Sequence, residues 1–454
     1  MKNFSFLACS VLIVIFNIAA SARTADHPAD WVEEAVSADQ SVAQKAQDQL
    51  RQIGPQGLEL LEQRFANEIS AHQSGMPSDE RWKRIAAALD RVGGQYDDYA
   101  SGLYWYTDLE KAKAAARTSG RPILSLRLLG RLDEDLSCAN SRFFRTTLYP
   151  SAEINQLLKN GFILHWESVR PAPRVTIDFG DGRTLQRTIT GNSIHYILDS
   201  DGKIVDALPG LYSAPVFTAE LQQAAAVVKE ARGKGTADYA EHMNVTCARL
   251  LQAWAADLAA INAPQPPSKA LAESALERWM DDNKWQQVAQ LHVNVAAFDG
   301  SVRELMARKF PSAPVAARVA MSKAAVETPM IRALGGSAQD PVQPQEYPDA
   351  RVAAPVAVAK MAAETPMMRA VRNLSGTVAL DTVQNNYMRR TKILAFLAGQ
   401  GHAYSLAQAN DWIYARIFLT PRQDPWLGLA PADVFAAIDG NGETRELGSL
   451  SATR

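Results

Sequence analysis

The chain has 454 residues, with 47 Lys and Arg against 49 Asp and Glu, so its formal net charge is −2. Its length allows roughly three domains, and its hydrophobic content of 47% and charged content of 21% are typical of globular proteins. The balance of charge removes the usual argument for a nucleic-acid partner, which needs a basic stripe, and three cysteines are too few for a disulfide-stapled scaffold or a zinc site of four thiolates.

Residues 1–22 have the pattern of a secretory signal peptide. Lys2 supplies the positive charge, residues 7–16 form an almost unbroken apolar run, and Ala20-Ser21-Ala22 offers small residues before a cleavage site. The run of about 10 residues is too short for a stable membrane span of roughly 20. We therefore expect an exported protein, periplasmic or secreted, with no membrane span after cleavage; an uncleaved N-terminal anchor is the alternative.

Residues 26–100 carry three apolar stripes at helical spacing, and Gly54-Pro55 separates the first two. The segment 37–61, S-A-D-Q-S-V-A-Q-K-A-Q-D-Q-L-R-Q-I-G-P-Q-G-L-E-L-L, resembles a HEAT-type helical repeat. Such a repeat presents a binding surface and performs no chemistry. A helical hairpin that only packs on the next domain is the alternative. The stripes are Val42, Ala46, Leu50 and Ile53; Leu58, Leu61, Phe65 and Ile69; and Trp82, Ile85, Leu89 and Val92.

Residues 101–232 alternate between helix and strand patterns. Thr107 and Glu110 predict a capping box for a helix that ends at Gly120. Further helices are predicted after Cys138, after Ser151 and over residues 217–230. The predicted strands are 122–126, 162–166, 175–179, 184–190, 193–199 and 203–208, of which 175–179 and 184–190 form an extra hairpin.

This order of elements resembles the thioredoxin fold, and it is most similar to secreted thioredoxin-like proteins that carry R-P-I-L, C-x-x-C, L-L-x-x-x-F, L-D-S-D-G-K and a Pro-Gly pair. The resemblance covers residues 121–230. It implies an α/β thioredoxin-like domain, a mixed sheet with flanking helices, embedded between mostly α-helical domains. The matching segments are Arg121 to Leu124, Cys138 to Ser141, Leu157 to Phe162, Leu198 to Lys203, and Pro209-Gly210.

The resemblance places Cys138 at the first, nucleophilic cysteine of C-x-x-C, but the site departs from the family in four ways. Ser141 stands where the second cysteine would be, and a hydroxyl cannot resolve a mixed disulfide. Ser193 stands at the family's cis-proline, which shapes the substrate-binding edge. Ser137 replaces the usual tryptophan, and the strand 122–126 lacks the buried acid. These departures argue against dithiol oxidoreductase activity.

Three states of Cys138 remain open: a reactive thiolate, an inert thiol and a disulfide with Cys247. A helix N-terminus favours the thiolate, and Arg142 and Arg145 would add to that effect. The acidic residues 133–135 oppose it.

Two of the seven histidines, His165 and His195, fall on predicted strands of one sheet. His195 lies two residues after Ser193, so it is a candidate base for Cys138; a sheet histidine satisfied by its neighbours is the alternative. No metalloprotease, phosphate-loop, dinucleotide-binding or serine-hydrolase motif occurs. We expect no metal and no cofactor.

Residues 233–454 are predicted to be mostly helical, with an internal duplication. Residues 315–334 recur as 352–371 with 13 identities in 20. Each copy contains E-T-P-M, whose Thr-Pro pair predicts a helix start. Two copies make a pseudo-symmetric pair and fall short of a solenoid. Other helices are predicted over 248–261, 270–289 and 410–419.

Two hypotheses for function follow. In the first, the exported protein is a single-thiol redox enzyme: Cys138 is the nucleophile, and a low-molecular-weight thiol or a protein partner in the envelope resolves the mixed disulfide. In the second, the degenerate thioredoxin-like domain and its helical flanks form a non-catalytic scaffold that binds a protein partner in the cell envelope. Neither hypothesis involves nucleic acid.

Overall fold

The computed structural model describes residues 27–188, 191–231, 239–263, 280, 282–294, 376 and 378–424. The predicted signal peptide and both copies of the duplication, 315–334 and 352–371, lie outside these residues. Within the described ranges, no helix combines the length and the apolar character needed to cross a membrane.

The N-terminal helices pack around a core of their own. The first predicted stripe lies on α2, the second on α3 and α4, and the third on α5. Their apolar side chains form one cluster with Val32 of α1 and with Val36, which follows α1. Val42 is the exception, because it is exposed near the start of α2. The helices are α1 (Pro28–Glu34), α2 (Gln40–Gln52), α3 (Pro55–Arg64), α4 (Ala66–Gln73) and α5 (Glu80–Gly93).

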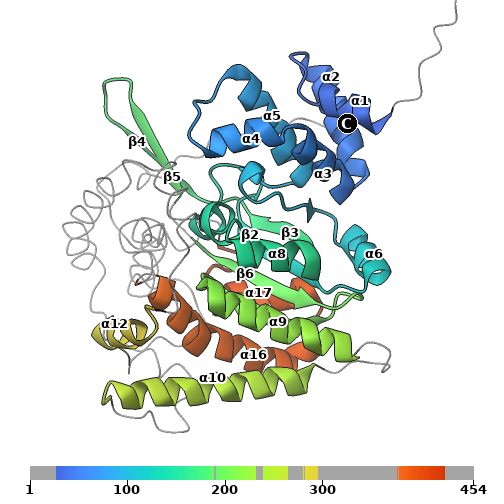
Figure 1. The fold of residues 1–454 in the computed structure, drawn as a ribbon. Coiled ribbons are helices and arrows are strands. Elements are labelled where there is room, and N and C mark those ends of the chain that lie inside the picture. Colours follow the sequence, from blue (N-terminus) through green and yellow to red (C-terminus); the bar gives the residue numbers. More distant parts are fainter. Residues whose placement is uncertain are drawn as a thin grey trace, which may run out of the picture.

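A five-stranded mixed sheet forms the centre of the molecule (Figure 1). Its order is β1-β3-β2-β6-β7: β1, β3 and β2 run parallel, and β6 and β7 run antiparallel to their neighbours. The predicted mixed sheet with flanking helices is confirmed. The strands are β1 (Trp105–Tyr106), β2 (Ile123–Leu129), β3 (Ile163–Arg170), β6 (Ser193–Leu198) and β7 (Ile204–Pro209).

The predicted extra hairpin lies between β3 and β6 in the sequence. Its strands, β4 (Arg174–Asp178) and β5 (Thr184–Thr188), pair antiparallel as a separate two-stranded sheet. The hairpin projects from the body of the molecule (Figure 1). Its position makes it available for contacts with another molecule.

Helices connect the strands at the predicted places. They are α6 (Leu109–Ser119), α7 (Ala139–Phe143), the π-type turn η2 (Phe144–Leu148), α8 (Ala152–Gly161) and α9 (Ala214–Ala231). The predicted cap of α6 is wrong by one residue. Asp108 precedes the helix, and its carboxylate accepts hydrogen bonds from the backbone N–H groups of Glu110 and Lys111 at 2.8 and 3.1 Å.

The described C-terminal helices share one core with the sheet. These helices are α10 (Ala240–Ala260), α12 (Asp282–Leu291), η4 (Asn385–Arg390), α16 (Thr391–Ala398) and α17 (Leu406–Arg416). Side chains alternate between the two faces of a strand. On β6, His195 therefore faces Phe217 of α9, whereas the Tyr196 hydroxyl donates to Asn410 of α17 on the other face, at 3.3 Å. The sheet thus lies between α9 and α17.

A buried ionic network fastens the C-terminal helices to the sheet. The guanidinium of Arg390 is buried, and its Nη2 lies 2.9 Å from Asp206 Oδ2 and 3.0 Å from Glu220 Oε2. His242 and Arg249 of α10 contact the same two carboxylates, at 3.0 and 2.7 Å. Burial opposes ionisation of Asp206, but Arg390, His242 and the Ala207 N–H together outweigh burial and lower the pKa of that carboxyl. The network joins β7, α9, α10 and η4.

Candidate functional site

Cys138 is the N-cap residue of α7, at the end of the loop that follows β2. Its backbone N–H donates to the Leu129 carbonyl at 3.1 Å, which fixes the residue beside the carboxyl end of the central strand. The side chain is fully buried, and its Sγ lies 3.5 Å from Ser141 Oγ. Ser141 Oγ also lies 2.7 Å from Ser137 Oγ. Ser137, Cys138 and Ser141 thus form one small buried polar group.

The environment of Cys138 favours the neutral thiol. Burial raises the pKa of Cys138, and this effect outweighs every group that acts the other way. Those groups include the Ser141 hydroxyl, the backbone N–H at the helix start and the positive charge of Arg142. The helix N-terminus and Arg142 therefore act in the expected direction, but desolvation determines the sign.

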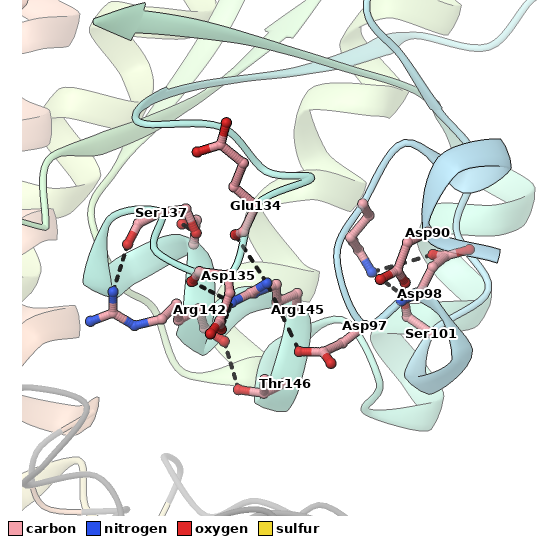
Figure 2. A network of polar contacts seen from close by, with 12 residues as sticks. Asp90, Asp97, Asp98, Ser101, Glu134, Asp135, Ser137, Arg142, Arg145 and Thr146 are labelled. Carbon is pink, nitrogen blue, oxygen red and sulfur yellow. Dashed lines mark hydrogen bonds and ion pairs between the residues drawn. The ribbon is translucent and has the colours of Figure 1, made fainter. Parts of the chain in front are cut away.

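Two arginines of the cysteine-bearing segment point to the loop that precedes it (Figure 2). Arg142 Nη1 donates to the Ser137 carbonyl and to Thr188 Oγ1, each at 2.6 Å. Arg145 is buried, and it donates to the carbonyls of Glu134 and Asp135 at 3.3 and 2.9 Å. Arg145 thus holds the acidic loop in place.

The same loop is joined to the N-terminal helices. Arg145 Nη1 lies 3.9 Å from Asp97 Oδ2, and its guanidinium lies over the Tyr96 ring at 4.7 Å. Behind Asp97, the buried Asp98 accepts a hydrogen bond from the Leu103 N–H at 3.1 Å. Asp90 accepts one from the Asp98 N–H at 2.8 Å, and burial raises the pKa of Asp90 to about 7. These carboxyl groups are visible beside Arg145 in Figure 2.

Ser193 lies next to the cysteine-bearing helix. It begins β6, pairs with Leu128 of β2, and accepts a hydrogen bond from Asn140 Nδ2 at 3.0 Å. The described residues contain no cis peptide bond, so the position aligned with the family's cis-proline is an ordinary trans serine. Asn140 was not identified from the sequence, where nothing marked it as a partner of Ser193.

His195 is fully buried, and its ring lies between those of Phe144 and Phe217, with centroids at 4.7 and 5.1 Å. Its Nε2 lies 2.8 Å from the Tyr149 hydroxyl, and its Nδ1 has no hydrogen-bond partner among the described residues. Burial lowers the pKa of His195 to about 3, so the ring is neutral at physiological pH. Its one hydrogen bond among the described residues goes to Tyr149, which favours the structural alternative over a base for Cys138.

His165 has a similar structural setting. Its Nδ1 lies 2.9 Å from Ser125 Oγ on the neighbouring strand. Burial lowers the pKa of His165 to about 3. Ser125 lies on β2, the strand without the buried acid that the resemblance implies, and His165 lies on β3.

Both described cysteines are free thiols. Cys247 lies on α10, is half-buried, and its Sγ is 3.6 Å from the Thr391 carbonyl. The structure therefore contains no Cys138–Cys247 disulfide. In the part of the chain that the structure describes, no group of three or more His, Cys, Asp or Glu side chains is arranged to hold a metal ion.

A further signal is present in the sequence of β2. Arg127 is the charged residue in the otherwise apolar or hydroxyl-bearing run of β2, and its side chain is only 7% exposed. A charge inside a buried strand is rarely accidental.

Comparisons with protein-family models, with curated proteins and with solved structures give no match to this chain.

Proposed function

We propose that this protein is an exported, non-catalytic binding module built on a thioredoxin-like sheet. The strand order β1-β3-β2-β6-β7 supports the thioredoxin-like part of the proposal, as does the cysteine-bearing helix that follows β2. The antiparallel pair β6 and β7 leads into α9, the closing helix that the resemblance implies. The hairpin β4–β5 is an insertion into this order.

The burial of Cys138 carries the non-catalytic part of the proposal. Thiol–disulfide exchange requires a thiolate that can reach the sulfur of its partner. The Cys138 thiol is fully buried, and burial raises its pKa. Ser141 cannot resolve a mixed disulfide, and His195 bonds to Tyr149. The framework is retained, whereas the reacting groups are absent or out of reach.

The partner would be a protein of the cell envelope, bound by the helical flanks or the hairpin. Phe179, next to the end of β4, is 52% exposed, and the hairpin that carries it projects from the body (Figure 1). Exposed aromatic side chains are frequent anchors of protein interfaces. The N-terminal helices add a second surface outside the sheet.

Single-cysteine variants test the proposal. In a Cys9→Ser background, Cys247→Ser leaves Cys138 alone, and Cys138→Ser leaves the half-buried Cys247 as a matched control. Each protein is titrated with an aromatic disulfide from about pH 6 to 10, with and without urea. We expect Cys138 to react roughly tenfold or more slowly than Cys247 in the folded protein, and both to react alike when unfolded.

The opposite result would support the first hypothesis. If Cys138 reacts readily in the folded protein with a thiolate pKa below about 8.5, the protein is a single-thiol redox enzyme with an external resolving thiol. Export is tested separately by the mass of the mature chain, which we expect to begin after Ala22.

A further inference from the structure

A cavity of about 740 Å³ opens on the sheet face that carries Arg127. It lies between α6, the end of β3, the turn that joins β6 to β7, and the helices α10, α16 and α17. Arg127 pairs with Ile194, so it faces away from His195 and from the side chains packed around that ring. The volume is in the range of small-molecule sites, roughly 300–1,000 Å³.

The charged lining of this cavity has a positive surplus. Its cationic residues are Lys113, Arg127, Lys203 and Arg422, and its carboxylates are Glu167 and Asp201. The ammonium group of Lys203 has no hydrogen-bond or ion-pair partner in the described ranges. Lys113 pairs with Glu110, whose side chain is 74% exposed, so this pair is open to solvent exchange. Arg127 and Arg422 are paired with Glu167 and Asp411, so Lys203 is the cation that an incoming anion would meet without a competing partner in the described ranges.

Arg127 is the buried part of this lining. Its Nη1 contacts Glu167, but its Nε has no hydrogen-bond partner among the described residues. The side chain of Glu167 is 58% exposed, so it is well hydrated. A buried N–H donor without an acceptor destabilises a structure, and an incoming carboxylate would satisfy it.

The remaining walls are largely apolar. Leu109, Ile204, Met243, Leu397 and Leu406 come from five different elements and line the same cavity. Asn410 adds a side-chain amide next to the Tyr196 hydroxyl. Apolar walls with a few polar groups are typical of sites that bind a small molecule in one orientation.

We propose that this cavity binds a small organic carboxylate with an apolar chain. The carboxylate pairs with Arg127, Lys203 adds a positive charge to the same cavity, and the chain packs against Met243, Leu397 and Leu406. A carboxylate accepts charge-assisted hydrogen bonds from guanidinium and ammonium groups, and an apolar chain gains from burial against these walls. This site depends neither on the reactivity of Cys138 nor on the protein partner.

Calorimetric titration of the full chain with three probes of equal chain length tests the proposal. Decanoate carries the expected head group, decanol lacks its charge and decylamine reverses it. We expect saturable binding of decanoate, at least tenfold weaker binding of decanol and no binding of decylamine. Tenfold corresponds to about 1.4 kcal/mol.

Two variants with the same change of charge locate the site. Lys203→Glu is expected to weaken decanoate binding at least tenfold, whereas Lys45→Glu, on α2 and outside the cavity, leaves it unchanged. Lys203 and Lys45 are both exposed, so both variants should retain the folded state, which a thermal melt verifies. The proposal is overturned if decanoate does not bind at millimolar concentration, if decylamine binds equally well, or if the two variants behave alike.

Discussion

Replacing Arg390 by methionine would remove the buried guanidinium that joins two buried carboxylates. Methionine has a similar length and no charge, so the packing volume is largely retained. Asp206 would keep His242 and Glu220 would keep Arg249, at 3.0 and 2.7 Å. The contacts between β7, α9 and η4 would lose their shared cation.

The expected loss of stability is large for one substitution. Breaking a buried ion pair by removing one partner costs about 3–5 kcal/mol, because a charge is left uncompensated. The remaining His242 and Arg249 place this variant near the lower end, about 3 kcal/mol. Arg249→Met is the control. Its side chain is 43% exposed, and a pair open to water contributes about 1 kcal/mol or less.

The pH dependence has a defined sign. In the wild type the pKa of Asp206 is lowered despite burial, so the stability that this group contributes is present above its unfolded pKa of about 3.9 and is lost as the pH falls through the folded value. Without Arg390, burial would raise that pKa. The Arg390→Met variant should therefore lose most stability near neutral pH and less in mild acid.

Urea unfolding followed by tryptophan fluorescence measures these differences. The triple variant Arg390→Met, Asp206→Asn, Glu220→Gln should recover most of the loss, because neutral groups then replace the stranded charges. The reasoning is refuted if Arg390→Met costs no more than Arg249→Met, or if the triple variant is no more stable than the single one.

Two further predictions concern the N-terminal helices. Burial raises the pKa of Asp90 to about 7, so between about pH 4 and 7 the folded protein holds a proton that the unfolded chain releases. The free energy of unfolding should therefore fall as the pH rises through this range. Asp90→Asn should flatten this part of the pH curve in urea titrations, and an unchanged slope would contradict the assignment. In Gly57→Ala the new Cβ would lie 2.0 Å from the Leu50 carbonyl oxygen, so we expect a loss of about 1–3 kcal/mol. Gly161→Ala, whose nearest atom is Leu157 Cδ1 at 3.3 Å, is the control, and equal melting temperatures would speak against close packing of α2 on α3.

The elements of the sheet domain could be predicted because each has a local signal. The apolar run that begins at Ile123 gives β2, and Gly120 ends α6 in the left-handed conformation with φ of 73°. The cap of α6 was misplaced because Thr107 and Asp108 are both good capping residues, and the sequence does not show which of them reaches the first N–H groups.

The environment of Cys138 could not be predicted, because it depends on residues far away in the sequence. The sequence placed the cysteine at a helix start, where the expected effect on its pKa is downward. Burial reverses that sign, and burial results from the packing of the thiol into the core that the sheet shares with the C-terminal helices. For the same reason the sequence makes His195 a candidate base for Cys138, whereas in the fold its ring is hydrogen-bonded to Tyr149.

The covering of the sheet by α17 has a consequence for how the chain acquires its structure. Tyr196 and Asn410, which meet across this contact, are 214 positions apart. During synthesis the strands can therefore pair long before α17, which covers one face of the sheet, has been made. Contacts this distant slow folding, and surfaces left bare in the meantime promote aggregation. We expect the nascent polypeptide to need a chaperone until its last helices emerge.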